Sequence, residues 1–265
     1  VDLRTDDGRD IARALIAKAD VVVENFRPGT LEKWGMGYET LAQTNPGLVM
    51  ARVSGFGQTG PHASRAGYAL VGEAMGGLRH ITGEPDRPPA RAGISIGDSL
   101  SGLNAALGVM MALHARQRTG KGQVVDAAIY ESVLTVMENL ITEYDLTGYI
   151  RERSGAVLPG IAPSNVYPTK SGELVLIGAN QDTLFKRLCD LMGRPDLADD
   201  PTLADNAAER CSIASATAPP SPAISSAARC RAGPDTAQGP SSASTVSPAR
   251  VVSLSRSGRC TTWAA

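Results

Sequence analysis

Asp20-Val21-Val22-Val23-Glu24-Asn25-Phe26-Arg27-Pro28-Gly29 is the stretch of the sequence that decides the fold class. Its three consecutive valines predict a strand that is buried on both faces, which is typical of a parallel sheet. Pro28 suits the first turn of a helix, so we expect the strand to lead into a short helix that runs through Trp34. Before the strand, apolar residues recur at helical spacing and predict a helix from about Asp7 to Lys18.

The same alternation of helix and strand continues along the first half of the chain. Residues 38–44 indicate a short helix, residues 48–54 a second buried strand and residues 123–126 a third strand. This alternation predicts an α/β fold with a Rossmann-like parallel sheet. Ligands of such sheets bind at the carboxyl ends of the strands. The two strand exits, Asn25-Phe26-Arg27 and Ser54-Gly55-Phe56-Gly57, are therefore candidate site loops.

The character of the sequence changes near residue 150, where we expect a domain boundary. Two long helices are expected upstream, and a hairpin and a helix downstream, over residues 99–116, 129–147, 165–168 with 173–178, and 183–192. The expected organisation is a large α/β domain over residues 1–129, a linker helix over 130–154, a partial smaller α+β domain over 155–210 and a low-complexity tail over 211–265.

Composition argues against several classes of function. The chain of 265 residues carries a formal net charge of −1, which gives no reason to expect nucleic acid as a partner. It has no unbroken run of about 18 apolar residues, so we expect no membrane partner. Cys189 is the only cysteine before residue 211, which fits a reducing compartment such as the cytoplasm.

The chain begins without Met and inside an apparent strand, so we expect the true start to lie upstream.

The tail from Cys211 to Ala265 differs in kind from the rest of the chain. It is rich in Ala, Ser and Pro, lacks Lys, Phe and Tyr, and has a single acidic residue, Asp235. Such a segment buries too little apolar area to offset its ordering entropy, which predicts disorder. A frameshift is the second interpretation, because a GC-rich gene read out of frame yields this composition. If neither other reading frame of the DNA continues a periodic pattern, the frameshift is contradicted.

Asp98 is the main candidate for catalysis, in the run Ile96-Gly97-Asp98-Ser99 at an expected helix start. One interpretation is an N-cap carboxylate that accepts hydrogen bonds from the first turn. The other is a nucleophile, since a helix dipole favours an ionised carboxylate that can attack a thioester carbonyl and hold the acyl group. Gly97 lets a substrate approach the backbone closely. Local physics leaves both interpretations open.

Other residues give weaker signals. Ser54–Pro61 is rich in Gly but matches neither a P-loop nor a dinucleotide fingerprint. Arg27 and Lys33 flank the first strand exit and suit either phosphate binding or a solvated surface. Tyr68 suits either a hydroxyl donor in a cleft or simple packing. The histidines show no metal-ligand spacing, so we expect no metal site; they are His62, His80 and His114.

Taken in order, several segments over residues 1 to about 210 resemble the CaiB/BaiF family (family III) of CoA transferases, and its formyl-CoA transferase-like members in particular. Each segment alone is weak evidence, and the resemblance rests on their order. The segments are Ala19–Gly29, Trp34–Glu39, Ser54–Pro61, Arg65–Tyr68, Ile81–Pro85, Gly97-Asp98 and Thr119–Asp126. The resemblance implies the large and small domains described above and, for the intact protein, an interlocked homodimer.

The resemblance also implies a reaction and a site. Asp98 matches the family's nucleophile, which transfers CoA from an acyl-CoA thioester to a carboxylic acid through a mixed anhydride and an aspartyl-CoA thioester. The CoA thioester is then a substrate, and no permanently bound cofactor is expected. The CoA site implied by the resemblance is lined by Asn25, Phe26, Arg27, Lys33, Ala66, Gly67, Tyr68 and Ala69.

Two alternatives stay open at this point. The family also contains α-methylacyl-CoA racemases, which need a His and an Asp on opposite sides of the α-carbon. Tyr68 matches the position of that His, and a phenol with a pKa of about 10 is a poor base at neutral pH. The second alternative is an inactive fragment, because we expect the family's N-terminal segment and its C-terminal return to be missing. The family's glycine-rich loop corresponds to Gly155–Ser164, which contains only two glycines.

Overall fold

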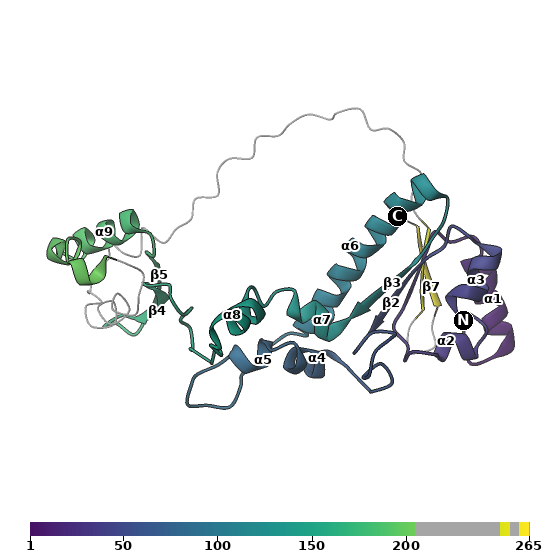
Figure 1. Cartoon of the computed structure of the whole chain (residues 1–265), viewed down its shortest axis with the longest axis horizontal. Coiled ribbons are helices and arrows are strands. Elements are labelled where there is room, and N and C mark those ends of the chain that lie inside the picture. The colour runs from purple at the N-terminus through teal and green to yellow at the C-terminus, as the bar shows by residue number, and fades with distance from the viewer. Residues whose placement is uncertain (205–249, 255–259, 265) are drawn as a thin grey trace. The chain divides into compact units, whose positions relative to one another are not determined.

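The computed structural model describes residues 1–204, 250–254 and 260–264 (Figure 1). The chain divides into two compact units. The first unit contains residues 1–82 and 90–151 together with two strands near the C-terminus, and the second contains residues 83–89 and, among the described residues, 152–204. The domain boundary expected near residue 150 lies beside the division between Arg151 and Glu152.

Among the described residues, the first unit is built on a five-stranded sheet in the order β3-β2-β1-β6-β7. β1 (Val21–Glu24) pairs in parallel with β2 (Val49–Ser54), which pairs in parallel with β3 (Val124–Ala128). On the other side of β1, β6 (Arg250–Leu254) is also parallel, and β7 (Cys260–Ala264) is antiparallel to β6. The predicted α/β fold with a parallel sheet is confirmed.

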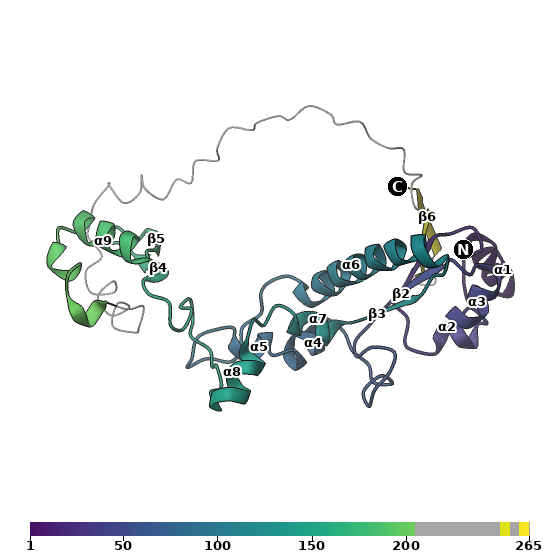
Figure 2. The ribbon, with the colours of Figure 1, turned by 45° about the horizontal axis from the view of Figure 1, so that its top comes forward.

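Helices cover both faces of this sheet (Figures 1 and 2). One face carries α1 (Asp6–Ile16), α2 (Thr30–Lys33) and α3 (Tyr38–Thr44), and the opposite face carries α6 (Ile96–Thr119). The sheet therefore lies between two helical layers, as in other parallel α/β sheets.

The strand residues alternate between the two layers. Val22 and Met50 are fully buried in the core beneath α1, α2 and α3. Val21 and Val49 point the other way and pack with Ala112 of α6. Because both faces are buried, neither set of positions needs polar residues, which explains the unbroken valine run of β1.

Two strands of the sheet come from the segment expected to be a low-complexity tail. β6 pairs with β1 in register from Val251 to Leu254, and Val252 and Leu254 are 3% and 1% exposed in the core. The expectation of disorder over 211–265 is therefore wrong for β6 and β7. The edge of β1 supplies hydrogen-bond partners and apolar cover that local composition does not reveal. The rest of the expected tail and residues 205–210 lie outside the described residues, and the frameshift interpretation stays a prediction.

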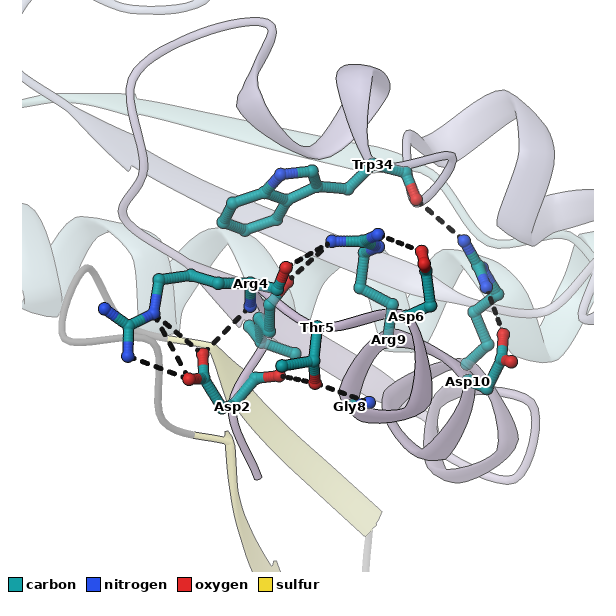
Figure 3. A network of polar contacts seen from close by, with 10 residues as sticks. Asp2, Arg4, Thr5, Asp6, Gly8, Arg9, Asp10 and Trp34 are labelled. Carbon is teal, nitrogen blue, oxygen red and sulfur yellow. Dashed lines mark hydrogen bonds and ion pairs between the residues drawn. The ribbon is translucent and has the colours of Figure 1, made fainter.

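α1 starts at a capped N-terminus and is tied to the end of α2 (Figure 3). The hydroxyl of Thr5 accepts a hydrogen bond from the backbone N–H of Gly8 at 3.1 Å. One turn from its end, Arg13 donates to the backbone carbonyl of Trp34 at 2.8 Å. Trp34 is the C-cap of α2, so this bond fixes the short helix that follows the exit of β1.

The helices between β2 and the second unit differ from expectation in two places. α6 begins at Ile96 and not directly after Asp98, which lies in its first turn. The single linker helix expected over 130–154 is wrong, because α7 (Ile129–Leu134) ends before α8 (Leu140–Thr147) begins. Between them Glu138 has a φ of 53°, a left-handed conformation that interrupts a right-handed helix. Upstream of α6 lie two short helices, α4 (Ala69–Met75) and α5 (Leu78–Ile81).

The second unit contains a hairpin and a helix close to their expected bounds. β4 (Ser164–Pro168) pairs antiparallel with β5 (Leu174–Gly178). α9 (Asp182–Leu191) follows, with 3₁₀ turns at Pro195–Leu197 and Pro201–Leu203. A small core joins the helix to these turns through Phe185, Cys189, Leu197 and Leu203.

α6 has an exposed apolar face. Leu103, Leu107, Met110 and Met111 are each more than half exposed. Within the part of the chain that the structure describes, α6 is the one helix long and apolar enough to cross a membrane, with a mean hydropathy of 1.3 over 18 residues. Core helices of soluble proteins share this length and composition.

Candidate active site

A cleft of about 430 Å³ opens at the carboxyl ends of β1 and β2, within the first unit. Parallel α/β sheets bind their ligands at this end of the strands. The lining also includes the start of α6 and residues of β6. It brings together six of the nine residues expected at the catalytic and CoA sites, namely Asn25, Phe26, Arg27, Gly67, Tyr68 and Asp98, with Ser54 and Gly55 of the second strand exit.

The exit of β1 is held in place through Phe26. Its ring is 6% exposed and packs edge-on against Trp34, with ring centroids 5.3 Å apart. Its backbone N–H donates to Oε2 of Glu24 at 2.7 Å. The neighbouring residues Asn25 and Arg27 are exposed at the cleft. The buried ring thus anchors a turn whose two flanking polar residues are exposed at the cleft.

A buried ion-pair network lies directly behind this turn. Arg52 of β2 donates from Nε to Oε1 of Glu24 at 2.6 Å, and from Nη1 and Nη2 to the carboxylate of Glu32 at 2.7 and 3.2 Å. Burial raises the pKa of Glu24, whereas the hydrogen bonds from Arg52 lower the pKa of Glu32. One guanidinium therefore joins a buried carboxylate at the end of β1 to a half-exposed carboxylate on α2.

Two chain segments cross at the cleft without side chains between them. A Cβ on Gly55 would lie 2.3 Å from Cα of Gly67, and a Cβ on Gly67 would lie 2.6 Å from Cα of Gly55. Real Cβ atoms essentially never come this close to backbone, so both positions require glycine. The crossing fixes the backbone directly before Tyr68, whose side chain is 57% exposed at the cleft.

The glycine-rich loop after β2 is anchored to β3. The backbone N–H of Gln58 donates to Oδ2 of Asp126 at 2.7 Å. The preceding residue, Gly57, has a φ of 83°, which favours glycine. This bond holds the loop beside the glycine crossing, and Asp126 and Gln58 both lie outside the cleft lining.

Asp98 is brought to the cleft by the packing of Gly97. Gly97 is buried, and a Cβ there would lie 3.2 Å from both the carbonyl oxygen of Ala69 and Cγ2 of Ile129. Asp98 follows with an exposed side chain in the first turn of α6, beside the positive end of the helix dipole. The N-cap interpretation of Asp98 is wrong, because Ser95 occupies that position.

Three residues expected at the CoA site do not line the cleft. Lys33 is exposed at the end of α2, and Ala66 is exposed beside the glycine crossing. Ala69 is buried at the start of α4, where its backbone packs against Gly97. Their expected roles stay predictions, and Ala69 supports the segment that carries Asp98.

The lining also includes residues that were not singled out from the sequence. Ser101 and Gly102 lie one helical turn beyond Asp98, so the spacing of a helix could have found them. Arg65 belongs to a segment that resembles the family, but an exposed Arg carries no local signal of its own. Ser253 and Leu254 of β6 could not have been found, because they reach the cleft only through pairing with β1.

The charges of the cleft suit an anionic ligand and a carboxylate nucleophile. Arg27 and Arg65 contribute two guanidinium groups, which bind phosphates and carboxylates. Of the two carboxylates in the lining, Glu24 is paired with Arg52, whereas Asp98 is exposed. In the described ranges, no group of three or more His, Cys, Asp or Glu side chains could hold a metal ion.

The sequence of this chain is similar to those of known CoA transferases. Over 208 residues it is 60% identical to a succinyl-CoA–D-citramalate CoA-transferase of Chloroflexus aurantiacus, covering 78% of this chain and 52% of that protein. Over 207 residues it is 40% identical to an acetyl-CoA:oxalate CoA-transferase of Acetobacter aceti, covering 78% of this chain and 53% of that protein. The chain thus spans about half the length of the curated relatives it matches.

A comparison of structures and a match to a family model point to the same family as these relatives. A crystal structure of a CaiB/BaiF family protein from Brucella suis superposes with a TM-score of 0.70 at 40% identity, covering 82% of this chain and 57% of that one. Residues 1–228 match the model of CoA-transferase family III. The resemblance inferred from the ordered segments is thereby confirmed, and the chain belongs to CoA-transferase family III.

Proposed function

We propose that the whole protein transfers CoA from an acyl-CoA thioester to a carboxylic acid, with Asp98 as the nucleophile. The observation that carries this proposal is the exposed carboxylate of Asp98 in a cleft that it shares with the β1 exit and Tyr68. A carboxylate can accept an acyl group covalently and so divide the transfer into easier steps.

In the first half of the reaction, the Asp98 carboxylate attacks the thioester carbonyl of the donor. The C–S bond breaks, CoA leaves as a thiolate, and an acyl–aspartyl anhydride forms. The thiolate then attacks the aspartyl carbonyl of the anhydride. This step releases the donor acid as a carboxylate and leaves an aspartyl-CoA thioester on Asp98.

In the second half, the acceptor carboxylate attacks the aspartyl thioester, and the CoA thiolate leaves again. A second anhydride now joins Asp98 to the acceptor. The thiolate attacks the acceptor carbonyl, which forms the new CoA thioester and regenerates the Asp98 carboxylate. Protons are neither gained nor lost over the cycle, so the reaction needs no strong general base. A phenol at the position of Tyr68, which is a poor base, is therefore compatible with CoA transfer.

CoA itself would occupy the β1 exit and the segment before α4. Arg27 is suited to the phosphates, and Asn25 and Phe26 to the rest of the nucleotide arm. Lys33 at the end of α2, and Ala66, Gly67 and Ala69 around the crossing, complete the proposed CoA site. Tyr68 would lie near the thioester. No permanently bound cofactor takes part, because CoA enters and leaves as part of the substrates.

The named relatives support a narrower substrate class. The relative with 60% identity is named for succinyl-CoA and D-citramalate, and others for L-malate, mesaconate, oxalate and glutarate. We infer that the donor is a dicarboxylic acyl-CoA such as succinyl-CoA, and that the acceptor is a small dicarboxylic acid. We further propose that the whole protein acts in the cytoplasm as a homodimer.

Covalent trapping on the purified chain tests the nucleophile. Succinyl-CoA is added, the reaction is quenched with hydroxylamine, and peptides are analysed by mass spectrometry. We expect a hydroxamate on Asp98 and none in Asp98→Asn. Asp145→Asn serves as the matched control, because Asp145 is exposed on α8 outside the cleft lining. The Asp145→Asn variant should still form the hydroxamate on Asp98. A chain that binds CoA but forms no adduct at Asp98 would contradict the nucleophile assignment.

A further inference from the structure

Glu24 and Arg52 face each other across the first two strands of the sheet. They are Cα partners in the parallel register of β1 and β2, and their side chains are 1% and 9% exposed. Parallel strands bring paired residues to the same face. The pair therefore lies at the carboxyl end of the sheet, directly beneath the cleft that Glu24 helps to line.

The hydrogen bonds of this pair reach both ends of the turn that follows β1. At the start of the turn, Oε2 of Glu24 accepts from the backbone N–H of Phe26 at 2.7 Å. After the turn, both carboxylate oxygens of Glu32 on α2 accept from Arg52, at 2.7 and 3.2 Å. The five residues from Asn25 to Gly29 are thus held between two carboxylates that share one guanidinium.

Stability alone does not account for this network. The desolvation of two buried charges commonly costs more free energy than their Coulomb attraction recovers. Proteins in which apolar residues replace a buried ion pair are therefore often as stable as the original. Here the cost is visible, because burial raises the pKa of Glu24 in spite of its bond to Arg52. The network supplies a fixed geometry, because the planar guanidinium of Arg52 sets the relative orientation of the two carboxylates.

The network also controls charge beside an anion site. Without Arg52, Glu24 and Glu32 would place two carboxylates close to the turn that carries Arg27. Coulomb repulsion would then oppose the binding of phosphates there. Lys33 follows Glu32 directly in α2, so fixing Glu32 also fixes the helix that carries the second proposed cation of the CoA site.

We propose that Arg52 is a positioning residue for CoA: through Glu24 and Glu32 it holds the Asn25–Gly29 turn and α2 in the arrangement that binds the CoA thioester. Arg52 does not touch substrate and acts only through these two carboxylates. The proposal rests on the proposed function, because it takes the β1 exit as the CoA site.

The test compares Arg52→Lys with a matched control on the full chain. Arg116→Lys is the control, because Arg116 donates to Asp20 at 2.9 Å and to the carbonyl of Gly47 at 2.9 Å. Asp20 directly precedes β1, so this ion pair lies at the amino end of the strand that Glu24 ends. Both variants keep the charge and lose the fork, but only Arg52→Lys should weaken CoA binding.

Two measurements separate positioning from a general loss of stability. Titration calorimetry with CoA should give a Kd about tenfold higher for Arg52→Lys and unchanged for Arg116→Lys. Single-turnover acylation of Asp98 by succinyl-CoA should need about tenfold more substrate for half-saturation, with a similar rate at saturation. If Arg52→Lys does not fold, Glu32→Gln takes its place, because Glu32 is half-exposed and the buried Arg52 keeps its ion pair with Glu24 in that variant.

The outcomes distinguish this proposal from the proposed function. If the wild-type chain binds no CoA, both are overturned. If it binds CoA and is acylated at Asp98, but Arg52→Lys and Glu32→Gln bind as tightly as Arg116→Lys, only the positioning role is overturned. A fall in the saturating rate with unchanged half-saturation would also refute it, because the network would then act on the chemistry and not on CoA placement.

Discussion

Gly72 of α4 lies against Ile129 of α7, and replacing it with alanine tests how tightly the helices behind the cleft are packed. A Cβ at position 72 would lie 2.5 Å from Cγ2, 3.1 Å from Cβ and 3.3 Å from the backbone carbon of Ile129. Ordinary contacts of this kind are 3.4–4 Å. Ile129 is buried and branched at Cβ, so it has few other rotamers to adopt. We therefore expect Gly72→Ala to destabilise the first unit.

The magnitude follows from two opposing contributions. Overpacking a dense core costs about 1–3 kcal/mol, and here the upper part of that range applies because backbone as well as side chain obstructs. Alanine recovers about 1 kcal/mol through its higher helix propensity. The net loss for Gly72→Ala should be about 1–2 kcal/mol. Gly102→Ala in α6 meets no atom within 4 Å and should instead gain about 0.5–1 kcal/mol.

The two variants thus differ by about 1.5–3 kcal/mol, or on the order of 3–12 °C in Tm. Thermal unfolding followed by tryptophan fluorescence measures this difference, because Trp34 and Trp263 both belong to the first unit. Opposite signs for two Gly→Ala changes rule out an explanation by propensity alone. If Gly72→Ala were as stable as the wild type, the close approach of α4 to α7 would be wrong.

Two further predictions concern other parts of the first unit. Leu254→Ala should cost about 2–4 kcal/mol, because Leu254 is 1% exposed in the core, and an unchanged Tm would exclude β6 from that core. Arg52 lowers the pKa of Glu32 below its usual 4.5. The Arg52–Glu32 ion pair therefore contributes to stability above pH 4.5, and this contribution is lost as the pH falls through the lowered pKa. The Tm difference between the wild type and Glu32→Gln should therefore shrink between pH 5 and pH 3, and a constant difference would contradict the pairing.

The valine run predicted the sheet correctly because its signal is local. A strand buried on both faces needs apolar residues at every position, and Val21 and Val22 serve opposite layers. The position of the cleft followed from topology, since strand exits of a parallel sheet meet at one edge. Asn25, Phe26 and Arg27 could therefore be placed at the site without knowledge of any tertiary contact.

Errors arose where tertiary contacts override local preference. Apolar spacing continues through residues 129–147, and nothing in it reveals the left-handed Glu138 that divides α7 from α8. The first turn of α6 packs through Gly97 against Ala69 and Ile129, and these contacts are remote in the sequence, so no local pattern reveals them. β6 gains its order from the edge of β1, more than 200 residues away along the chain.

The crossing of Gly55 and Gly67 has a consequence for the evolution of this site. A clash between two side chains can be relieved when the partner becomes smaller, which leaves correlated substitutions among descendants. Here each glycine is obstructed by the backbone of the other, and no substitution makes a backbone smaller. We expect both positions to stay glycine in active descendants, so that one of the tightest contacts of the site leaves no covariation in an alignment.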